Sequence, residues 1–283
     1  MKEEYIDLHV HTSYSDGIFT PKEVIEYCKK VGVVAVGITD HDNIDGIEEA
    51  LIEGEKLGVE VVPGVEISCD FKDTFEEEIH ILGYYIDYKD TNLKQKLKFF
   101  QEARQKRAYK IFHKLVSLGV PIKEEDVFKN SIKSIGRLHF ARVLKEKKIV
   151  SSIKEAFELY LGYGKPAYET KLKVSPQEAV SVIVEAKGIP ILAHPYLEIS
   201  MDAKSIKKLI EYGIKGIEVY HSKHPKNIID ELSLLAEKYN LLITGGSDCH
   251  GSIDGHPPLL GSLKIPYKIL ENIKIYKETL VNS

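Results

Sequence analysis

Two histidines one residue apart, His9 and His11, close the first apolar segment of this 283-residue chain, and Asp16 follows them. Side chains at positions i and i+2 of a strand share one face, roughly 6.6 Å apart at the backbone. Both imidazoles can therefore reach one ion, and imidazole nitrogens with carboxylate oxygens suit Zn²⁺, Mn²⁺ or Fe²⁺. Taken alone, the histidine pair could arise by chance, and Asp16–Gly17 would be an ordinary turn.

Ligand-type side chains recur at the ends of most later apolar segments, and one lies inside the fourth. Asp248 and His250 repeat the i, i+2 spacing, which turns Cys249 away from them. His80 alone would be a core histidine in most proteins. Burying so many titratable groups without ions would cost several kcal/mol, so their coincidence predicts a metal site. The further candidates are His41, Glu66, His80, His194, His221, Asp248 and His250.

Such a site needs a scaffold that brings distant segments together. Short segments rich in Val and Ile alternate with amphipathic ones, as in parallel strands covered by helices. Repeated units of this kind build an open parallel sheet or a closed barrel, and in a barrel the carboxyl ends of the strands meet on one face. The expected strands span residues 5–11, 33–39, 59–65, 78–86, 189–194, 216–221 and 241–246. The expected helices between them span residues 21–30, 44–57, 176–187, 203–212 and 225–239.

Local signals mark the ends of these helices. Thr20 and Ser175 each place a capping hydroxyl before a proline at the first helical position. A glycine after each of four helices is expected to adopt the left-handed conformation that ends a helix. These glycines are Gly32, Gly58, Gly188 and Gly213.

Residues 92–172 interrupt the alternation, and we expect a helical substrate-binding subdomain inserted into a barrel formed by residues 1–91 and 173–283. Between residues 89 and 174 there are 21 Lys and Arg against 9 Asp and Glu, whereas the remainder has 18 against 34. The segment is therefore strongly basic inside an acidic frame. A solvated, lysine-rich helical surface would give the same count. Its expected helices span residues 93–118, 134–148 and 152–161.

Composition points to a soluble globular protein, with 43% hydrophobic and 29% charged residues. No apolar run approaches the roughly 20 residues that span a bilayer, and the first residues lack the apolar stretch of a signal peptide. The three cysteines are too few and too scattered for a disulfide framework. We therefore expect a cytoplasmic protein without a membrane partner.

The ordered motifs resemble those of the PHP family (polymerase and histidinol phosphatase), whose fold is a distorted barrel of seven βα units. They are DLHVHTSYSDG, ITDHDNIDG, PGVEIS, LGY, AHP, EVYHSKH and GGSDCHG. Within residues 92–172, SIGRLHFARVL and YLGYGKPAYE resemble one branch of that family. It comprises phosphatases of nucleoside 3′,5′-bisphosphates and 5′-to-3′ exoribonucleases of the RNase AM type. The fold expected from the resemblance is thus α/β, a distorted (β/α)7 barrel with an inserted helical subdomain.

The resemblance implies three metal positions, and each is filled by the residue type that the family pattern requires. Two to three divalent ions are expected, with Mn²⁺ first and Zn²⁺, Fe²⁺ or Mg²⁺ as alternatives that His and carboxylate ligands also accept. The first ion would take His9, His11, Glu66 and Asp248. The second would take Asp16, His41 and His250. The third would take His80 and His194, with Glu66 bridging toward the first.

Two ions about 3.5–4 Å apart can share a hydroxide and clamp a phosphate, so we expect in-line attack on a phosphomonoester. Asp40 would orient the imidazole of His41. His221 would protonate the leaving oxygen or hydrogen-bond the phosphate. His224 and His256 lie in loops and are expected at the surface.

The basic insert would bind a second phosphate or a nucleotide chain. Arg137 suits a bidentate contact to phosphate and Lys165 a point contact, while His139 could bind phosphate or stack on a base. Each of these also has a plain surface interpretation. The tyrosines in or near the insert could stack on a base or pack in a core. They are Tyr109, Tyr160, Tyr163 and Tyr168.

We expect a metal-dependent phosphomonoesterase that acts on nucleotides, either nucleoside 3′,5′-bisphosphates or monophosphates, and that could also trim the 5′ ends of short RNA. No obligate protein partner is inferred. One alternative is a histidinol-phosphate phosphatase. Another is a non-catalytic, metal-stabilised scaffold that binds nucleic acid, which the net charge of −4 disfavours.

Overall fold

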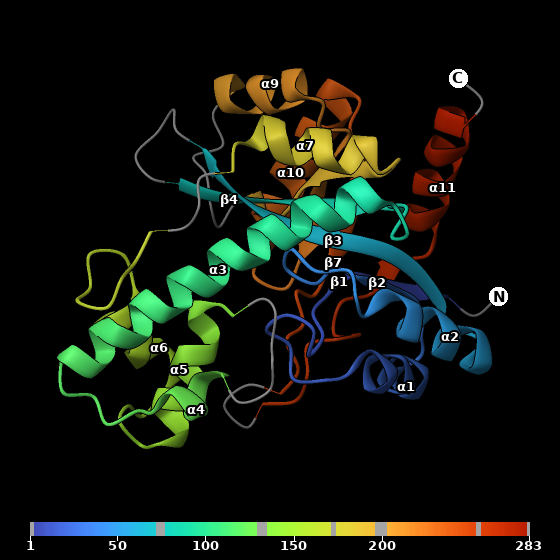
Figure 1. Ribbon diagram of the computed structural model, residues 1–283. Coiled ribbons are helices and arrows are strands. Elements are labelled where there is room, and N and C mark those ends of the chain that lie inside the picture. Colours follow the sequence, from blue (N-terminus) through green and yellow to red (C-terminus); the bar gives the residue numbers. More distant parts are fainter. Residues whose placement is uncertain are drawn as a thin grey trace.

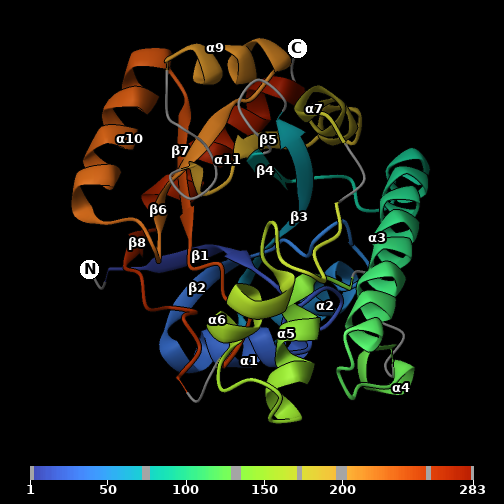
Figure 2. The same cartoon turned by 90° about the vertical axis from the view of Figure 1, so that its left-hand side faces the viewer.

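Eight strands form one sheet that curls into a nearly closed barrel (Figures 1 and 2). The computed structural model describes residues 3–71, 77–128, 135–170, 174–195, 203–252 and 256–281. The strand order is β7-β6-β5-β4-β3-β2-β1-β8. The strands are β1 (Tyr5–Val10), β2 (Val33–Ile38), β3 (Glu60–Phe71), β4 (Glu77–Tyr84), β5 (Ile189–Leu192), β6 (Gly216–His221), β7 (Leu242–Gly246) and β8 (Ile265–Pro266).

The barrel closes where the carboxyl ends of β1 and β7 meet. The amide of Asp248 donates to the carbonyl of His9 at 2.9 Å, and the amide of His11 donates to that of Cys249 at 3.0 Å. The two backbones approach so closely at Gly246 that a Cβ there would lie 2.3 Å from the amide nitrogen of His9. Closure therefore aligns two ligand-bearing strand ends from opposite ends of the chain.

Strand β4 departs from the expected alternation, because it runs antiparallel to both β3 and β5. It pairs with β3 from Phe71 and Glu77 onward, and only five residues separate the two strands in the chain. Its amino end therefore lies beside the carboxyl end of β3, where Ser68 pairs with His80. This reversal explains why the fourth strand carries its ligand-type residue near its beginning rather than at its end.

Helices cover the outside of the barrel, with α7, α9 and α10 along one side and α1 and α2 along another (Figures 1 and 2). The Thr20 hydroxyl accepts the amide of Glu23 and Ser175 accepts that of Glu178, as the sequence predicts. These helices are α1 (Pro21–Val31), α2 (Ile47–Leu57), α7 (Pro176–Glu185), α9 (Ala203–Tyr212), α10 (Lys226–Tyr239) and α11 (Lys268–Val281). Helix α11 and the short strand β8 were not expected from the sequence.

One predicted helix end was wrong. Gly32, Gly58 and Gly213 have the expected positive φ angles, but after α7 the left-handed residue is Lys187, with φ 60°. Gly188 is required for a different reason, because a Cβ there would lie 2.6 Å from the side chain of Ile86.

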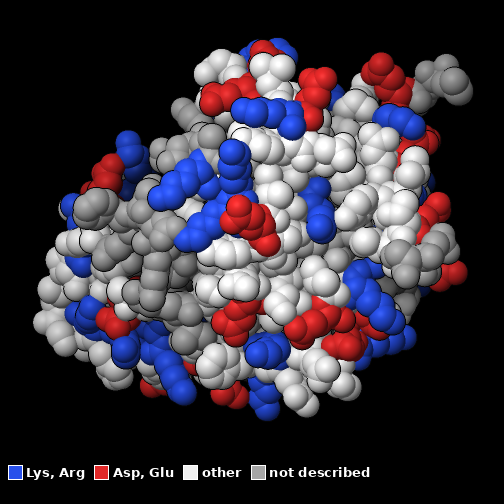
Figure 3. All heavy atoms as spheres, turned by 90° about the horizontal axis from the view of Figure 1, so that it is seen from above, with Lys and Arg blue, Asp and Glu red and all other residues white. Residues whose placement is uncertain are grey.

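The segment between β4 and α7 is helical and has a second hydrophobic core, which includes Ile111, Leu115, Phe140 and Leu144. The first half of α3 packs instead on the barrel core through Leu93, Leu97 and Phe100. The helices are α3 (Thr91–Ser117), α4 (Glu124–Phe128), α5 (Arg137–Glu146), α6 (Ile153–Ala156) and the π-helical turn η1 (Phe157–Leu161). Figure 2 shows α5 and α6 in front of the barrel, and in Figure 3 the charged side chains visible at this end of the molecule (left) include more Lys and Arg than Asp and Glu.

Within the described ranges, no helix is both long and apolar enough to cross a lipid bilayer.

We predict that Gly246→Ala will destabilise the protein by about 3–5 kcal/mol, because the new methyl group would force β7 away from His9. Urea-induced unfolding measures this change. Gly119→Ala is the matched control, since Gly119 has φ +79° but nothing within 4 Å of an added Cβ, so only about 1–2 kcal/mol is expected. Equal losses in the two variants would contradict the close-approach argument.

Candidate metal centre

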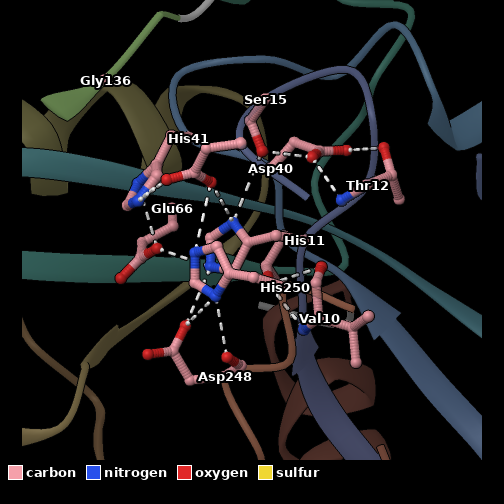
Figure 4. A network of polar contacts seen from close by, with 12 residues as sticks. Val10, His11, Thr12, Ser15, Asp40, His41, Glu66, Gly136, Asp248 and His250 are labelled. Carbon is pink, nitrogen blue, oxygen red and sulfur yellow. Dashed lines mark hydrogen bonds and ion pairs between the residues drawn. The ribbon is translucent and has the colours of Figure 1, made fainter. Parts of the chain in front are cut away.

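Glu66, in β3, lies at the centre of a cluster of imidazoles at the barrel mouth (Figure 4). Its Oε2 atom is 3.1 Å from His11 Nε2, 3.1 Å from His41 Nδ1 and 3.3 Å from His9 Nε2. Its Oε1 atom is 2.8 Å from His80 Nδ1 and 3.0 Å from His194 Nε2. One buried carboxylate thus faces five imidazoles that come from β1, β4 and the ends of β2 and β5.

Asp16 organises a second group on the same face. Its Oδ1 atom is 3.2 Å from His250 Nε2 and 3.7 Å from His11 Nδ1, and its Oδ2 atom is 3.8 Å from His41 Nε2. Donor atoms of all four residues lie within 4.8 Å of one another. The predicted set of Asp16, His41 and His250 is therefore assembled, with His11 beside it.

Asp248 joins the first predicted set, because its Oδ1 atom lies 3.2 Å from His11 Nε2 and 3.6 Å from His9 Nε2. Its backbone has φ 56°, and His194 and Asp42 also have positive φ angles, of 23° and 49°. Non-glycine residues adopt this region at an energetic cost of order 1–3 kcal/mol, and such residues cluster at functional sites. The backbone is thus strained at two predicted ligands and beside a third, His41.

The donor spacing fits divalent ions. Two ligand atoms that each lie about 2.1 Å from one ion, with a right angle between the two bonds, are about 3 Å apart. The separations around Glu66 are close to this value. Asp16 Oδ1, His41 Nδ1 and Glu66 Oε2 are also buried without a hydrogen-bond partner. Buried polar atoms are rarely left so, and an ion is one of the usual reasons. The structure brings all nine predicted ligands together, and their metal binding stays a prediction.

The electrostatics keep the carboxylates ionised. Burial alone would raise the pKa of Glu66, but the imidazoles of His41, His80 and His9 hold it well below its usual value. The same balance lowers the pKa of Asp16, through His250 and His41. The cluster therefore presents anionic oxygen ligands, which divalent cations prefer.

Glu218, in β6, is a functional candidate that the sequence analysis missed. It is fully buried, and the His9 Nδ1–H group donates to its Oε1 atom at 3.1 Å. The amide of His194 donates to its Oε2 atom at 2.8 Å. This pairing fixes the tautomer of His9 with Nε2 facing Glu66, as carboxylates commonly do for metal-binding histidines. The available signal was a glutamate inside the apolar strand GIEVYH, where an unpaired charge would be costly.

Asp40 has a different role from the predicted one. Its carboxylate accepts hydrogen bonds from the Thr12 amide at 2.7 Å, from the Thr12 hydroxyl at 2.6 Å and from the Ser15 hydroxyl (Figure 4). The adjacent ends of β1 and β2 bring these groups together, while His41 Nδ1 turns toward Glu66. Asp40 therefore orients the loop that carries Asp16 rather than the imidazole of His41.

His221 lies at the barrel mouth as predicted, with Nε2 3.6 Å from Asp248 Oδ2. The amide of Lys223 donates to its Nδ1 atom at 3.2 Å, so the proton of the neutral ring is on Nε2 and points toward the metal cluster. The surface assignment of His224 was wrong. His224 is buried, and its Nδ1–H group donates to the Val219 carbonyl at 2.9 Å, whereas His256 is exposed.

Two arginines of the helical insert, which the sequence analysis did not single out, reach the barrel mouth. Arg142 donates to the carbonyl of Asp16 and, at 3.5 Å, to the carbonyl of His250. Arg104 forms a buried ion pair with Asp42 and donates to the Ser68 hydroxyl at 2.8 Å. These contacts attach the insert to the loops that hold the second predicted ion.

The three residues predicted to contact the substrate do not all lie beside the predicted metal ligands. Arg137 begins α5, and its guanidinium group lies 5.7 Å and 5.6 Å from the ring centroids of Phe157 and Tyr168. The His139 Nδ1 atom accepts the Gly136 amide at 3.3 Å, and a Cβ at Gly136 would lie 3.9 Å from Asp16. Lys165 is exposed in the turn after η1. His139 is thus beside the metal cluster, whereas the described contacts of Arg137 are with the insert.

The PHP domain family matches residues 7–201, which is more than half of the chain. The chain belongs to the PHP family. Among curated relatives, a 5′-3′ exoribonuclease from Haemophilus influenzae is 34% identical, covering 88% of this chain and 91% of that protein. A 3′,5′-nucleoside bisphosphate phosphatase from Chromobacterium violaceum is 32% identical, covering 88% of each. A phosphoribosyl 1,2-cyclic phosphate 1,2-diphosphodiesterase from Eggerthella lenta is 31% identical, covering 90% and 97%.

Solved structures agree with this assignment. A protein from Bifidobacterium adolescentis, assigned as a metal-dependent phosphoesterase, superposes with a TM-score of 0.86 at 28% identity, covering 95% of both chains. A Chromobacterium violaceum structure, named an amidohydrolase and solved with bound sulfate and no metal, superposes with a TM-score of 0.83 at 31% identity, covering 95% and 96%, and so supports the fold. The expected PHP barrel is confirmed, and the chain is a metal-dependent phosphoesterase of this family.

We predict that Glu218→Gln will weaken the affinity for divalent metal ions by about 10- to 100-fold. Glutamine lacks the negative charge that orients His9, and its NH2 group would replace one of the two oxygens that accept from His9 and from the backbone amide of His194. Titration with Mn²⁺ in competition with a chelator measures the effect, and circular dichroism checks the fold. Glu60→Gln makes the same chemical change at the amino end of β3, where Glu60 pairs with Lys274 at 2.7 Å, and should leave metal affinity unchanged. Unaltered affinity in Glu218→Gln would refute the assigned role.

A second prediction concerns His139, whose pKa is lowered to about 4 by desolvation and by the nearby guanidinium groups of Arg142 and Arg104, against the pull of Asp16. The unfolded chain takes up this proton from about pH 6.5, so the wild type should lose stability as the pH falls from about 6.5 to about 4. His139→Gln keeps an acceptor for the Gly136 amide but does not titrate. Over this range the free energy of unfolding of His139→Gln should fall by about 1–3 kcal/mol less than that of the wild type. Parallel pH profiles for the two proteins would disprove the assignment.

Proposed function

We propose that this protein hydrolyses phosphomonoesters of nucleotides, with nucleoside 3′,5′-bisphosphates as substrates, and that it also trims short RNA by hydrolysing the phosphodiester bond nearest the 5′ end. The observation that carries the proposal is a cluster of histidine and carboxylate side chains, able to hold metal ions, that lies beside a basic helical insert. A metal cluster attracts one phosphate, and cationic groups beside it suit a second phosphate on the same molecule. The names of the Haemophilus and Chromobacterium relatives support this substrate class.

We propose two to three divalent ions in this site, with Mn²⁺ first among the candidates. His9, His11, Glu66 and Asp248 would hold one of them. Asp16, His41 and His250 would hold another, while His80 and His194 would share Glu66 with a third. When bound, such ions activate water and neutralise charge that develops on the phosphate.

The chain's own groups would orient the substrate and move a proton. His221 carries its proton on Nε2, 3.6 Å from Asp248, so it can donate to a phosphate oxygen or to the leaving oxygen. Arg142 holds the backbone of Asp16 and His250, which keeps their side chains aimed at one point. Arg137 and Lys165 stay proposed contacts for the second phosphate.

Chromatographic analysis of the products from a small substrate panel tests the proposal, because a phosphomonoester releases inorganic phosphate, 5′ trimming of RNA releases a mononucleotide, and a cyclic diester opens without releasing phosphate. The panel contains adenosine 3′,5′-bisphosphate, AMP, a 5′-phosphorylated RNA oligomer, histidinol phosphate and phosphoribosyl 1,2-cyclic phosphate, each with added Mn²⁺ and with chelator. We expect the bisphosphate and the RNA oligomer to be hydrolysed fastest and chelator to abolish turnover. Preference for histidinol phosphate or for the cyclic diester would replace the proposed substrate class.

Two variants separate chemistry from binding in the same assay. Asp16→Ala should abolish turnover while the protein stays folded. Arg137→Ala should raise KM for the bisphosphate about tenfold, because a charged contact to the second phosphate is lost. It should change KM for p-nitrophenyl phosphate, which has no second phosphate, only slightly. Retained turnover in Asp16→Ala would contradict the multi-ion proposal, and equal changes for both substrates would remove the role of Arg137.

A further inference from the structure

Helix α3 borders a trough that neither the metal cluster nor the proposed second-phosphate contacts use. The trough has a volume of about 640 Å³ and lies between α3, the loop after β2 and the insert residues Phe128 and Ile135. On α3 its wall runs from Lys94 to Tyr109, which at 1.5 Å per residue is roughly 22 Å. A single nucleotide is much shorter than this wall.

One part of the trough lies beside the metal centre. The side-chain amide of Gln101, in its wall, donates to the carbonyl of Asp42 at 2.9 Å, one residue after the predicted ligand His41. Ile135, also in the wall, directly precedes Gly136, where a Cβ would be 3.9 Å from Asp16 Oδ2. A chain that leaves the metal cluster on this side would therefore enter the trough within about one residue of its ligands.

The chemistry of the wall suits a single nucleic-acid strand. Lys94 and Lys98 lie one helical turn apart and are exposed, and within the described part of the chain neither has a carboxylate within ion-pair distance. Tyr109 lies at the far end, with its ring stacked on Phe128 at 4.4 Å between centroids. Proteins that bind single strands without strict sequence preference combine such cations with aromatic rings. Asp45 and Glu102 also line the trough, so it is not a general anion site.

We propose that this trough holds the part of a single-stranded RNA chain that lies 3′ of the nucleotide at the metal centre. The inference rests on the proposed function and extends it from mononucleotides to polynucleotides. When an enzyme trims a chain from its 5′ end, the strand on the 3′ side of the reacting bond lies outside the metal centre, which contacts only the reacting end. Phosphates of the following nucleotides would meet Lys98 and then Lys94, which precede Gln101 along α3. Tyr109 lies on the other side of Gln101, so its ring would meet a base that extends from the metal centre in the opposite direction.

Equilibrium binding of oligomers of increasing length tests the trough. The probes are 5′-phosphorylated 2′-O-methyl oligoribonucleotides of one, two, four and six nucleotides, measured by fluorescence anisotropy with the Mn²⁺-loaded protein at several salt concentrations. For the wild type, affinity should rise with length. The double variant Lys94→Ala/Lys98→Ala should bind the hexamer about tenfold more weakly, with a log–log salt slope smaller by about 1.4, that is about 0.7 for each lost phosphate contact. Its affinity for the mononucleotide should not change.

Lys96→Ala is the matched control, because Lys96 lies between the two lysines in sequence but pairs with Glu178 at 3.8 Å. It should leave the length dependence intact. Wild-type affinity that does not rise with length would overturn the inference. An equal loss of affinity for monomer and hexamer in the double variant would also overturn it, as would the same effect in Lys96→Ala.

The outcome is separable from that of the proposed function. If the wild type releases phosphate from adenosine 3′,5′-bisphosphate but shows no length-dependent binding, the trough proposal fails and the phosphatase proposal stands. If no nucleotide is hydrolysed but Lys94 and Lys98 still govern the affinity for longer oligomers, the trough stands as a nucleic-acid site and the proposed reaction fails.

Discussion

The burial of Glu66 among five imidazoles is the constraint on which the rest of this structure depends. An ionised carboxylate with no counter-charge is too costly to bury, and imidazoles packed together would repel one another if protonated. The arrangement is stable only if the charges are balanced, by shared protons or by cations. Strands β1, β2 and β5 must end, β4 must begin, and β3 must pass Glu66 at the same place to deliver these groups, so the barrel topology determines the site. The reversed direction of β4 contributes to the site, because it brings His80 to the barrel mouth beside Glu66.

The helical insert belongs to this site rather than being an appendage to it. Arg104 links α3 to Asp42 and Ser68, and Arg142 links α5 to the backbone of Asp16 and His250. These contacts cross from a basic segment to an acidic frame, so the uneven charge along the chain becomes electrostatic complementarity in space. The same contacts bring the α3 trough next to the predicted metal ligands. The proposed substrates, which carry several phosphates, would therefore meet cations on more than one side.

Sequence alone determined the elements whose signals are local. The capping hydroxyls of Thr20 and Ser175, the prolines after them and the glycines that follow α1 and α2 specify helix ends through interactions within a few residues. The ligand set was also visible, because histidines and carboxylates at the ends of so many apolar strands would be costly to bury without an ion. The family motifs then predicted how these ligands are shared among ions.

Tertiary structure decided everything that depends on residues far apart in the chain. Glu218 meets His9 across 209 positions, so its role could not be read from its neighbours. Asp40 accepts from Thr12 and Ser15 because β1 and β2 are adjacent. The antiparallel direction of β4 likewise arises only when it packs between β3 and β5. The walls of the α3 trough also come from separate segments that pack together. Local sequence specifies which groups are present, and packing specifies which of them meet.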